Sequence, residues 1–193
     1  QVIPAACRRR DDLGALEHRN RELEVEITER KQAEERMVRQ SRVLDAVNQV
    51  LRESLRCDTR EEVARTCLKV AEELTDSRFG FIGELNQAGL FDTTAISNPG
   101  WDACSMPDSD ATKLITDMPI RGVALSMLRE EKSRIVNDPV SHPDHVTLPE
   151  GHPQITAFLG VPLKREGKTV GMIGLANKES GYTLADQGNG ESL

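Results

Sequence analysis

The sequence predicts an α+β protein in which a long helix precedes an antiparallel sheet flanked by helices. Residues 11–56 contain no Pro and a single Gly, and Glu, Arg, Gln and Leu dominate them, which is typical of a long helix. After Ser77, short apolar runs alternate with turn-forming residues, which indicates strands. Two of the turns join neighbouring runs as hairpins. Hairpin strands pair antiparallel, so the pattern excludes a doubly wound parallel sheet.

The length and charge of the chain narrow the class of protein. The 193 residues suit one domain and an appendage, and they contain no apolar run long enough for a membrane segment. The net charge is −7, and acidic residues outnumber basic ones both before and after Ser77. Binding to a nucleic acid backbone needs clustered Lys and Arg, so we expect no nucleic acid partner. The chain lacks an initial Met, and we expect a segment of a longer protein.

The cysteines give no metal or redox motif. The four thiols belong to Cys7, Cys57, Cys67 and Cys104, and no two of them have the spacing of a zinc knuckle or a CxxC pair. We therefore expect free thiols in a reducing, cytoplasmic protein.

Apolar residues recur every seven positions along the long helix. One column is apolar at five of six positions: Leu16, Leu23, Arg30, Met37, Leu44 and Leu51. Its companion column is apolar at only two of six: Leu13, Asn20, Ile27, Glu34, Ser41 and Asn48. A helix of roughly 65–70 Å has no core of its own, so we predict a coiled-coil homodimer through residues 11–56. The polar positions either fix the register of the pair or permit two registers.

The remaining elements follow from caps, turns and periodicity. A second helix is expected to begin at a capping box, with Asp58 or Thr59 as the N-cap, and to end near Thr75. Five strands are expected at residues 79–85, 90–98, 133–138, 156–165 and 169–177, with a hairpin at each end of the sheet. Helices are expected at residues 122–131 and from about residue 182. The predicted organisation is a tail and helix at 1–56, a domain at 57–187 and a tail at 188–193.

Four segments of this domain resemble a known family. Gly122–Leu128, Ile135–Pro139, Phe158–Leu163 and Val170–Asn177 are similar to the corresponding segments of GAF domains, which share a PAS-related fold. Upstream, Glu22–Arg36 is similar to the signalling helices that link sensor domains in bacterial multi-sensor histidine kinases. The resemblance implies a sheet of about five to six strands, with the helices from the chain ends on one face. A ligand pocket then lies on the other face, closed by residues 99–131 and 139–155.

The resemblance also implies a function. We expect a sensory or regulatory domain of a two-component signal-transduction protein that binds an unknown small molecule. The change passes through the dimeric helix to an output kinase domain outside these residues. The alternative is a module for dimerisation and spacing that binds no ligand. The sequence contains no catalytic motif, so we do not expect this segment to be an enzyme.

The ligand itself stays open. The signatures of cyclic-nucleotide-binding, bilin-binding and methionine-sulfoxide-reducing members are not recognisable, and Cys104 is followed by Ser105 instead of His. The cofactor is therefore left unassigned, and a domain that binds none is one of the alternatives. The candidates for the pocket lining are Phe81, Trp101, Cys104, Asp138, His152 and Phe158.

Several of these candidates have a plain structural alternative. Trp101 either stacks on a ligand or fills the core, and Cys104 is either a reactive thiol or a small buried apolar residue. Asp138 either accepts a ligand hydrogen bond or builds an Asx turn. His142, His145 and His152 form a weak metal-site candidate, because histidines in loops more often cap turns or face solvent.

Overall fold

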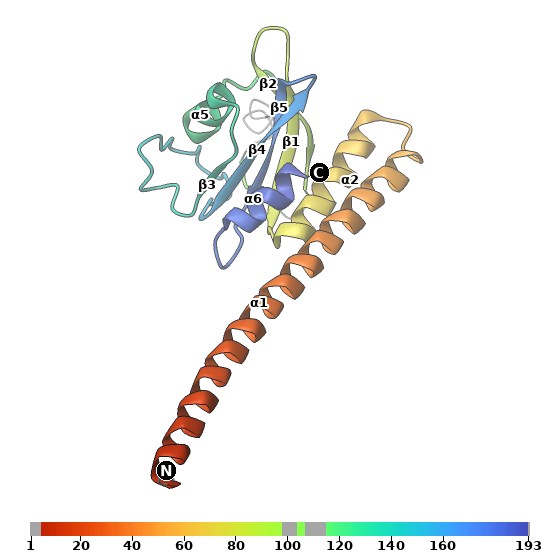
Figure 1. Cartoon of the computed structure of the whole chain (residues 1–193). Helices are drawn as coiled ribbons and strands as arrows, with labels where there is room; N and C mark the ends of the chain where they lie inside the picture. The colour runs from red at the N-terminus through yellow and green to blue at the C-terminus, as the bar shows by residue number, and fades with distance from the viewer. Residues whose placement is uncertain (1–4, 98–103, 107–114, 193) are drawn as a thin grey trace. The chain divides into compact units, whose positions relative to one another are not determined.

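The computed structural model describes residues 5–97, 104–106 and 115–192 (Figure 1). The chain divides into two compact units, the first ending at Arg42 and the second beginning at Val43. Trp101, one of the predicted pocket residues, lies outside the described residues.

The first unit consists of the long helix α1 (Ala5–Ser54), which continues into the second unit. The predicted long helix is confirmed. Between residues 16 and 42 every side chain except that of Ala33 is exposed, including Leu16 at 61%, Leu23 at 40% and Met37 at 68%. The predicted heptad column therefore faces solvent in a single chain. None of the described helices is long and apolar enough to cross a membrane.

The second helix of the chain, α2 (Arg60–Thr75), begins where the sequence predicts. The Thr59 hydroxyl accepts a hydrogen bond from the Glu62 amide at 3.2 Å, and the Glu62 carboxylate accepts one from the Thr59 amide at 3.4 Å. This capping box satisfies two of the amides that a helix start leaves unpaired. The helix ends at Asp76, which adopts a left-handed conformation with φ 54°.

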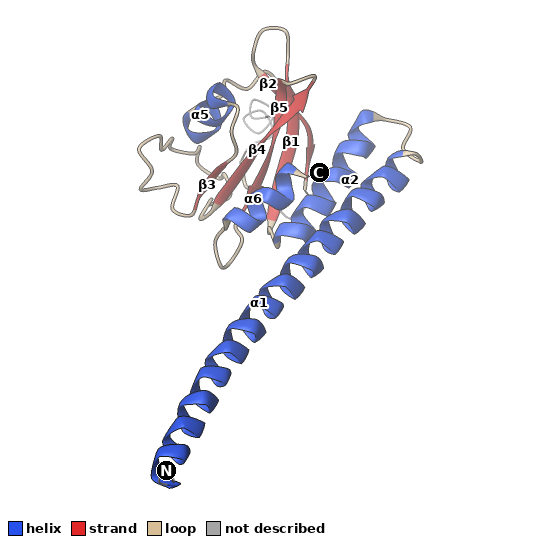
Figure 2. Ribbon diagram, in the orientation of Figure 1, coloured by secondary structure: helices blue, strands red, loops and turns tan. Residues whose placement is uncertain are grey.

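The five strands form one antiparallel sheet (Figure 2). They are β1 (Phe79–Leu85), β2 (Phe91–Ile96), β3 (Arg134–Val136), β4 (Phe158–Arg165) and β5 (Lys168–Ala176). The order is β2-β1-β5-β4-β3. The prediction of a hairpin at each end of the sheet is wrong for β4 and β5. That hairpin lies in the middle, because β5 also pairs with β1 and β3 pairs with the outer edge of β4.

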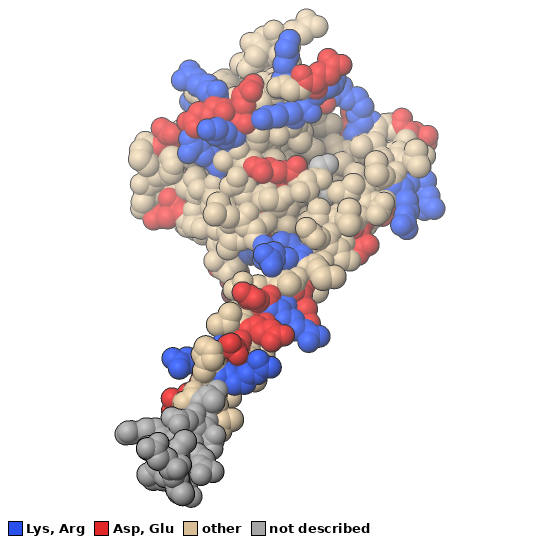
Figure 3. Space-filling model, viewed as in Figure 1, with Lys and Arg blue, Asp and Glu red and all other residues tan. Residues whose placement is uncertain are grey.

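The two faces of the sheet carry different layers. Helices α2 and α6 (Leu184–Glu191) lie against one face, and α5 (Gly122–Glu130) lies against the other (Figure 1). The apolar core between α2 and the sheet contains these buried residues: Ala64, Leu68, Ala71, Ile82, Ala95, Leu159, Val161, Ile173 and Leu175. Because side chains alternate along a strand, the residues of β4 and β5 that face α5 are not those that face the core under α2 and α6. Acidic and basic side chains intermix on the surface shown in Figure 3.

Helix α6 is fixed by a buried ion pair. The Lys178 ammonium donates to the Asp186 carboxylate at 2.7 Å, and the two side chains are only 13% and 8% exposed. The same carboxylate accepts hydrogen bonds from the amide and hydroxyl of Thr183, which caps the helix. Burial raises the pKa of Asp186, but Lys178 and Thr183 outweigh it and the net pKa is lowered.

A line of hydroxyl groups joins α2 to the segment before α6. The Tyr182 and Ser77 hydroxyl oxygens are 2.8 Å apart, and Ser77 is 2.6 Å from the Thr75 hydroxyl, which donates to the Ala71 carbonyl at 2.7 Å. Burial raises the pKa of Tyr182 to about 12, so the phenol stays protonated and available for this contact.

Asp186→Ala is expected to lower the free energy of unfolding by about 3 kcal/mol. The substitution leaves the Lys178 ammonium buried without its counter-ion and removes the cap of α6. The control is Glu73→Ala, which breaks the exposed pair with Lys69 and should change stability by less than about 0.5 kcal/mol. Urea denaturation measures both variants, and equal losses would contradict the assigned role of Asp186.

Glu72→Gln is expected to stabilise the protein at neutral pH. Burial raises the pKa of Glu72 against a hydrogen bond from Ser97, and the Glu72 Oε1 atom is buried without a hydrogen-bond partner among the described residues. Because the folded-state pKa lies above the unfolded-state pKa, the free energy of unfolding falls as the pH rises from the unfolded-state value through the folded-state value. Chemical denaturation at pH 4 and pH 7 should show the advantage of the variant growing with pH. An advantage that is the same at both values would show that the carboxyl does not titrate differently on folding.

Candidate functional site

The face of the sheet under α5 is built on two glycines. Gly160 of β4 and Gly174 of β5 are directly paired across the two strands, and Phe81 of β1 pairs with Gly174 on its other side. A Cβ atom on Gly174 would lie 2.5 Å from two ring carbons of Phe81, and one on Gly160 would lie 2.6 Å from the Met127 sulfur. Side chains from β1 and α5 therefore occupy the space that larger residues would fill.

Two of the predicted pocket residues meet on this glycine pair. Phe81 and Phe158 both contact the Cβ position of Gly174, with the nearest Phe158 ring carbon at 3.1 Å. The Phe81 ring also meets Phe91 edge to face, with ring centroids 5.8 Å apart and planes at 81°. This geometry is favourable because the positive edge of one ring faces the negative face of the other.

Helix α5 covers the aromatic layer. Phe91, Met127 and Met172 are fully buried there, and the half-buried residues around them are Phe81, Leu85, Met118, Ile120, Ala124 and Leu128. Backbone hydrogen bonds between Phe91 and Met118, at 3.0 and 2.9 Å, fasten the segment before α5 to the edge of β2. The described side chains therefore fill the space directly beneath α5.

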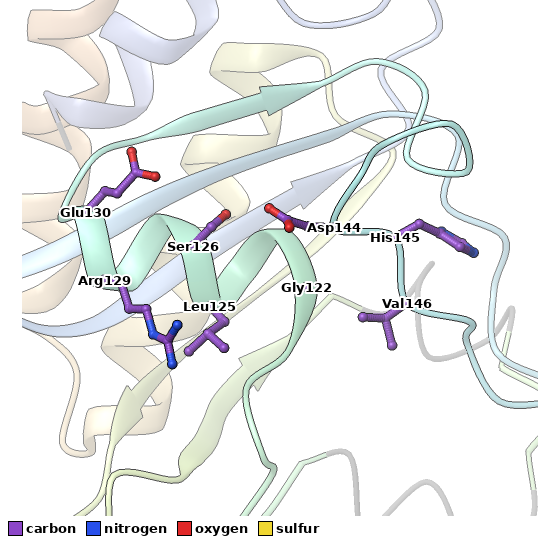
Figure 4. A pocket seen from close by; sticks show the side chains of 8 residues that line it. All are labelled: Gly122, Leu125, Ser126, Arg129, Glu130, Asp144, His145 and Val146. Atoms are coloured by element: carbon purple, nitrogen blue, oxygen red, sulfur yellow. The ribbon is translucent and has the colours of Figure 1, made fainter.

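An open cleft of about 480 Å³ lies beside α5, between this helix and the loop after β3 (Figure 4). One face of α5 supplies Gly122, Leu125, Ser126, Arg129 and Glu130, at the spacing of successive helical turns. The loop supplies Asp144, His145 and Val146. The walls thus combine apolar side chains, a hydroxyl, a guanidinium and two carboxylates.

The loop packs against α5 at Gly122. This residue has φ +60°, and a Cβ atom there would lie 2.7 Å from the Asp144 carbonyl oxygen and 2.8 Å from the Val146 side chain. Glycine is favoured for both reasons, because it adopts a left-handed conformation without strain and leaves room for the loop. At the other side of the cleft, Glu130 forms an ion pair with Arg134 of β3.

Two asparagines anchor the long loop between β3 and β4. The Asn137 side-chain oxygen accepts from the Tyr182 amide at 2.7 Å, and its amide group donates to the Tyr182 carbonyl at 2.9 Å. The Asn177 side chain accepts from the Thr156 amide and donates to the Gln154 carbonyl, both at 2.8 Å. The ends of the loop are therefore fixed by side-chain hydrogen bonds, while the part that lines the cleft packs against α5 at Gly122.

The three loop histidines form such local contacts. His142 Nδ1 accepts a hydrogen bond from the Asp144 amide at 3.1 Å, which requires that this nitrogen carry no proton. His145 Nδ1 and His152 Nδ1 lie 3.0 and 2.8 Å from the Pro139 and Pro153 carbonyl oxygens, so these nitrogens carry the proton. Among the described residues no group of three or more His, Cys, Asp or Glu is arranged to hold a metal ion.

The other predicted pocket residues lie around the loop. Asp138 is exposed, and its carboxylate accepts a hydrogen bond from the Ser141 amide at 3.3 Å. The hydrogen bonds from Ser141 lower the pKa of Asp138. The Ser105 amide donates to the Gly151 carbonyl at 2.9 Å, so the neighbouring residues Cys104 and His152 flank one backbone contact between two loops.

The cleft brings forward residues that the sequence analysis did not single out. Leu125, Ser126, Arg129 and Asp144 line it, and of the eight lining residues only His145 was named in advance, as a metal candidate. A signal existed for those on α5, because positions 122, 125, 126 and 129 share one helical face. Nothing in the sequence indicated which segment of the loop would lie against that face.

The sequence matches a known family over most of this unit. The family described as GAF domain matches residues 57–193. Solved structures with the same fold include the GAF domain of a phosphoenolpyruvate-protein phosphotransferase from Coxiella burnetii. It has a TM-score of 0.63 and 15% identity, and the match covers 77% of this chain and 86% of that one.

Two further neighbours come from proteins with other activities. A free methionine-R-sulfoxide reductase from Neisseria meningitidis, solved with its substrate, has a TM-score of 0.52 and 18% identity over 72% of this chain and 78% of that one. The chromophore-binding domain of a Stigmatella aurantiaca bacteriophytochrome has a TM-score of 0.53 and 15% identity over 80% of this chain and 56% of that one. At such identities these likenesses establish the fold alone.

Gly174→Ala is expected to lower the free energy of unfolding by about 1–3 kcal/mol, because the added methyl group forces the Phe81 ring off the sheet. Gly188→Ala in α6 is the matched control, since no atom lies within 4 Å of its added methyl group. The control should be neutral or stabilise by up to about 1 kcal/mol. Equal urea midpoints for the Gly174 variant and the unaltered chain would show that the aromatic layer is not tightly packed on the sheet.

Proposed function

Because the chain belongs to the GAF domain family over residues 57–193, we propose that it is the sensory part of a signalling protein. GAF domains are generally sensory or regulatory. The sensor module corresponds to residues 57–187, and it binds a small molecule whose presence biases the conformation of the domain. The parent is a cytoplasmic sensor histidine kinase. Support for this finer assignment comes from residues 22–36, which are similar to the signalling helices of such kinases.

The observation that carries the proposal is the cleft beside α5. Its volume of about 480 Å³ lies within the range typical of small-molecule sites, roughly 300–1,000 Å³. Arg129 and Asp144 offer groups of opposite charge, and Leu125 and Val146 offer apolar surface. A small polar metabolite with an apolar portion fits this mixture. One wall is a helix and the other is a loop, so a ligand that bridges them favours one arrangement of the loop over another.

The strands β4 and β5 provide a route from this site to the helices on the opposite face. Gly160 and Gly174 face the aromatic layer under α5, while the adjacent Leu159 and Leu175 are fully buried in the core on the opposite face of the sheet. A shift of α5 and the loop at residues 139–155 changes the packing of Met127 on Gly160. The same strands then alter the packing of α2, which follows α1 in the chain.

In this proposal the partner of α1 is a second copy of the chain. Apolar residues of α1 such as Leu16, Met37 and Leu44 are 61–68% exposed, and exposed leucines at heptad spacing are typical of a helix that pairs with another. The homodimer forms through residues 11–56, and a change in its register or rotation carries the signal to an output kinase domain.

A second candidate function is dimerisation and spacing without a ligand. It is favoured by the complete burial of Phe91, Met127 and Met172, since side chains of the protein itself fill the space between α5 and the sheet. In this case the cleft beside α5 has no occupant and the domain only sets the distance between its neighbours.

Native mass spectrometry of the purified chain, with an absorption spectrum, tests the proposal. A sensor is expected to show a dimer with a bound small molecule, or a thermal shift with members of a panel of nucleotides, amino acids and organic acids. Arg129→Ala should weaken that binding at least about tenfold, because it removes a charged group from the cleft. Arg121→Ala removes an exposed charge that does not line the cleft and should leave binding unchanged.

Each outcome separates the two candidate functions. A dimer without any bound species or thermal shift supports the spacing function and contradicts the sensory one. A monomer removes the homodimer from both. Equal binding by the two arginine variants places the ligand outside the cleft.

A further inference from the structure

We propose that two copies of α1 pair in parallel, with Arg30 of each chain forming an ion pair with Glu34 of the other. The inference rests on the proposed homodimer and specifies its direction and register. It assigns an interaction to the least apolar part of the heptad pattern, where arginine and glutamate replace the expected leucines.

The first argument for this ion pair is the position of the two charged residues within the heptad repeat. Arg30 occupies the column of Leu16, Leu23 and Met37, and Glu34 occupies the companion column one layer further along. Four residues of helix correspond to about 6 Å of rise, which the Arg and Glu side chains span easily. In a parallel pair in register, each Arg30 therefore has the partner's Glu34 in the adjacent layer.

The single chain leaves both groups available for this contact. Within one helix the Arg30 Nε atom lies 3.6 Å from a Glu34 carboxylate oxygen, and the two side chains are 81% and 66% exposed. A pair so exposed is weakly held. The seam of the dimer is formed by the two heptad columns, where the helices meet. Without an interchain contact, the two Arg30 side chains would repel each other there, as would the two Glu34 side chains, and all four would lose hydration. The seam therefore favours the interchain contact.

Asn20 favours the parallel direction. In a parallel pair in register, Asn20 lies opposite the partner's Asn20, and each amide can satisfy the other. The antiparallel arrangement that also brings Arg30 opposite Glu34 places residues whose numbers add up to 64 opposite each other. It therefore sets Asn20 against the partner's Leu44 and Leu23 against the partner's Ser41. Polar groups then face leucines without hydrogen-bond partners, which is unfavourable.

Charges beside the seam agree with the parallel register. In a parallel pair, a residue that flanks the seam meets the flanking residue five positions later in the partner helix. Opposite charges then meet in two places, where Arg19 faces Glu24 and where Glu26 faces Lys31. Asp12 and Glu17 form one pair of like charges near the start of the helix. Arg19 bonds Glu22 of its own helix at 3.3 Å, through an exposed contact that is easily exchanged.

Mixing two charge variants of the whole chain tests the ion pair. Arg30→Glu leaves each chain with carboxylates at both positions 30 and 34, and Glu34→Arg leaves each chain with guanidiniums at both. Each homodimer is therefore repulsive, and only the mixed dimer brings opposite charges together. Native mass spectrometry of an equal mixture should show mixed dimers in at least about tenfold excess over the random distribution. Since each variant helix is the same in both dimers, effects on helix stability cancel.

The control mixture uses His18→Glu and Glu22→Arg. The His18 Nε2 atom lies 3.3 Å from a Glu22 carboxylate oxygen at the same i,i+4 spacing, but the heptad positions of both residues face away from the partner helix. The control should give the random distribution. A random distribution for the Arg30 and Glu34 variants as well, with the unaltered chain dimeric, overturns this inference and leaves the homodimer standing. A monomeric unaltered chain overturns the homodimer itself.

Cysteine crosslinking tests the direction. In a chain whose native cysteines are replaced by serine or alanine, Asn20→Cys should form a disulfide-linked dimer under mild oxidation. Gln32→Cys, at an outward position of the same helix, should remain unlinked. An antiparallel pair would instead link a chain with Asn20→Cys to one with Leu44→Cys and leave Asn20→Cys alone unlinked. That result, like a failure of both, contradicts the parallel register.

Discussion

The pairing of Gly160 with Gly174 is the constraint on which the site depends. Two adjacent strands without side chains at the same level allow the rings of Phe81 and Phe158 to lie directly on the backbone of the sheet. Helix α5 then approaches closely enough for Met127 to rest on Gly160. The cleft lies at the edge of this layer because its centre is filled. Larger residues at either glycine would raise α5 and change the shape of the cleft.

The same two strands serve both layers of the domain. In β4 and β5, side chains alternate between α5 on one face and the layer of α2 and α6 on the other, so the apolar core and the aromatic layer share one backbone. Polar contacts then fix the outer parts, with Asp186 holding α6 and Asn137 and Asn177 holding the ends of the long loop. The least constrained part of the site is the middle of that loop, where histidines bond only to nearby backbone.

The sequence predicted local features better than tertiary placement. The capping box at Thr59, the turn at residues 86–89 and the heptad column of α1 each depend on neighbouring residues, and the structure contains them. Phe81 and Phe158 were predicted only as candidates for the pocket lining, and the structure brings both rings together on Gly174. The central position of the β4–β5 hairpin and the contact of residues 144–146 with α5 depend on long-range packing. The helical period groups Ser126 and Arg129 on one face of α5, but local patterns do not show that the loop lies against that face, so the cleft was not predicted.

The covering of β2 by residues 115–118 has a consequence for aggregation. An edge strand with free amides and carbonyls can recruit a strand of another molecule and grow into fibres. Here the segment at Ile115 and Met118 occupies hydrogen-bonding groups of Phe91 and Thr93, and the opposite edge is β3, which has only three residues. Both borders of the sheet are thus poor templates for strand addition.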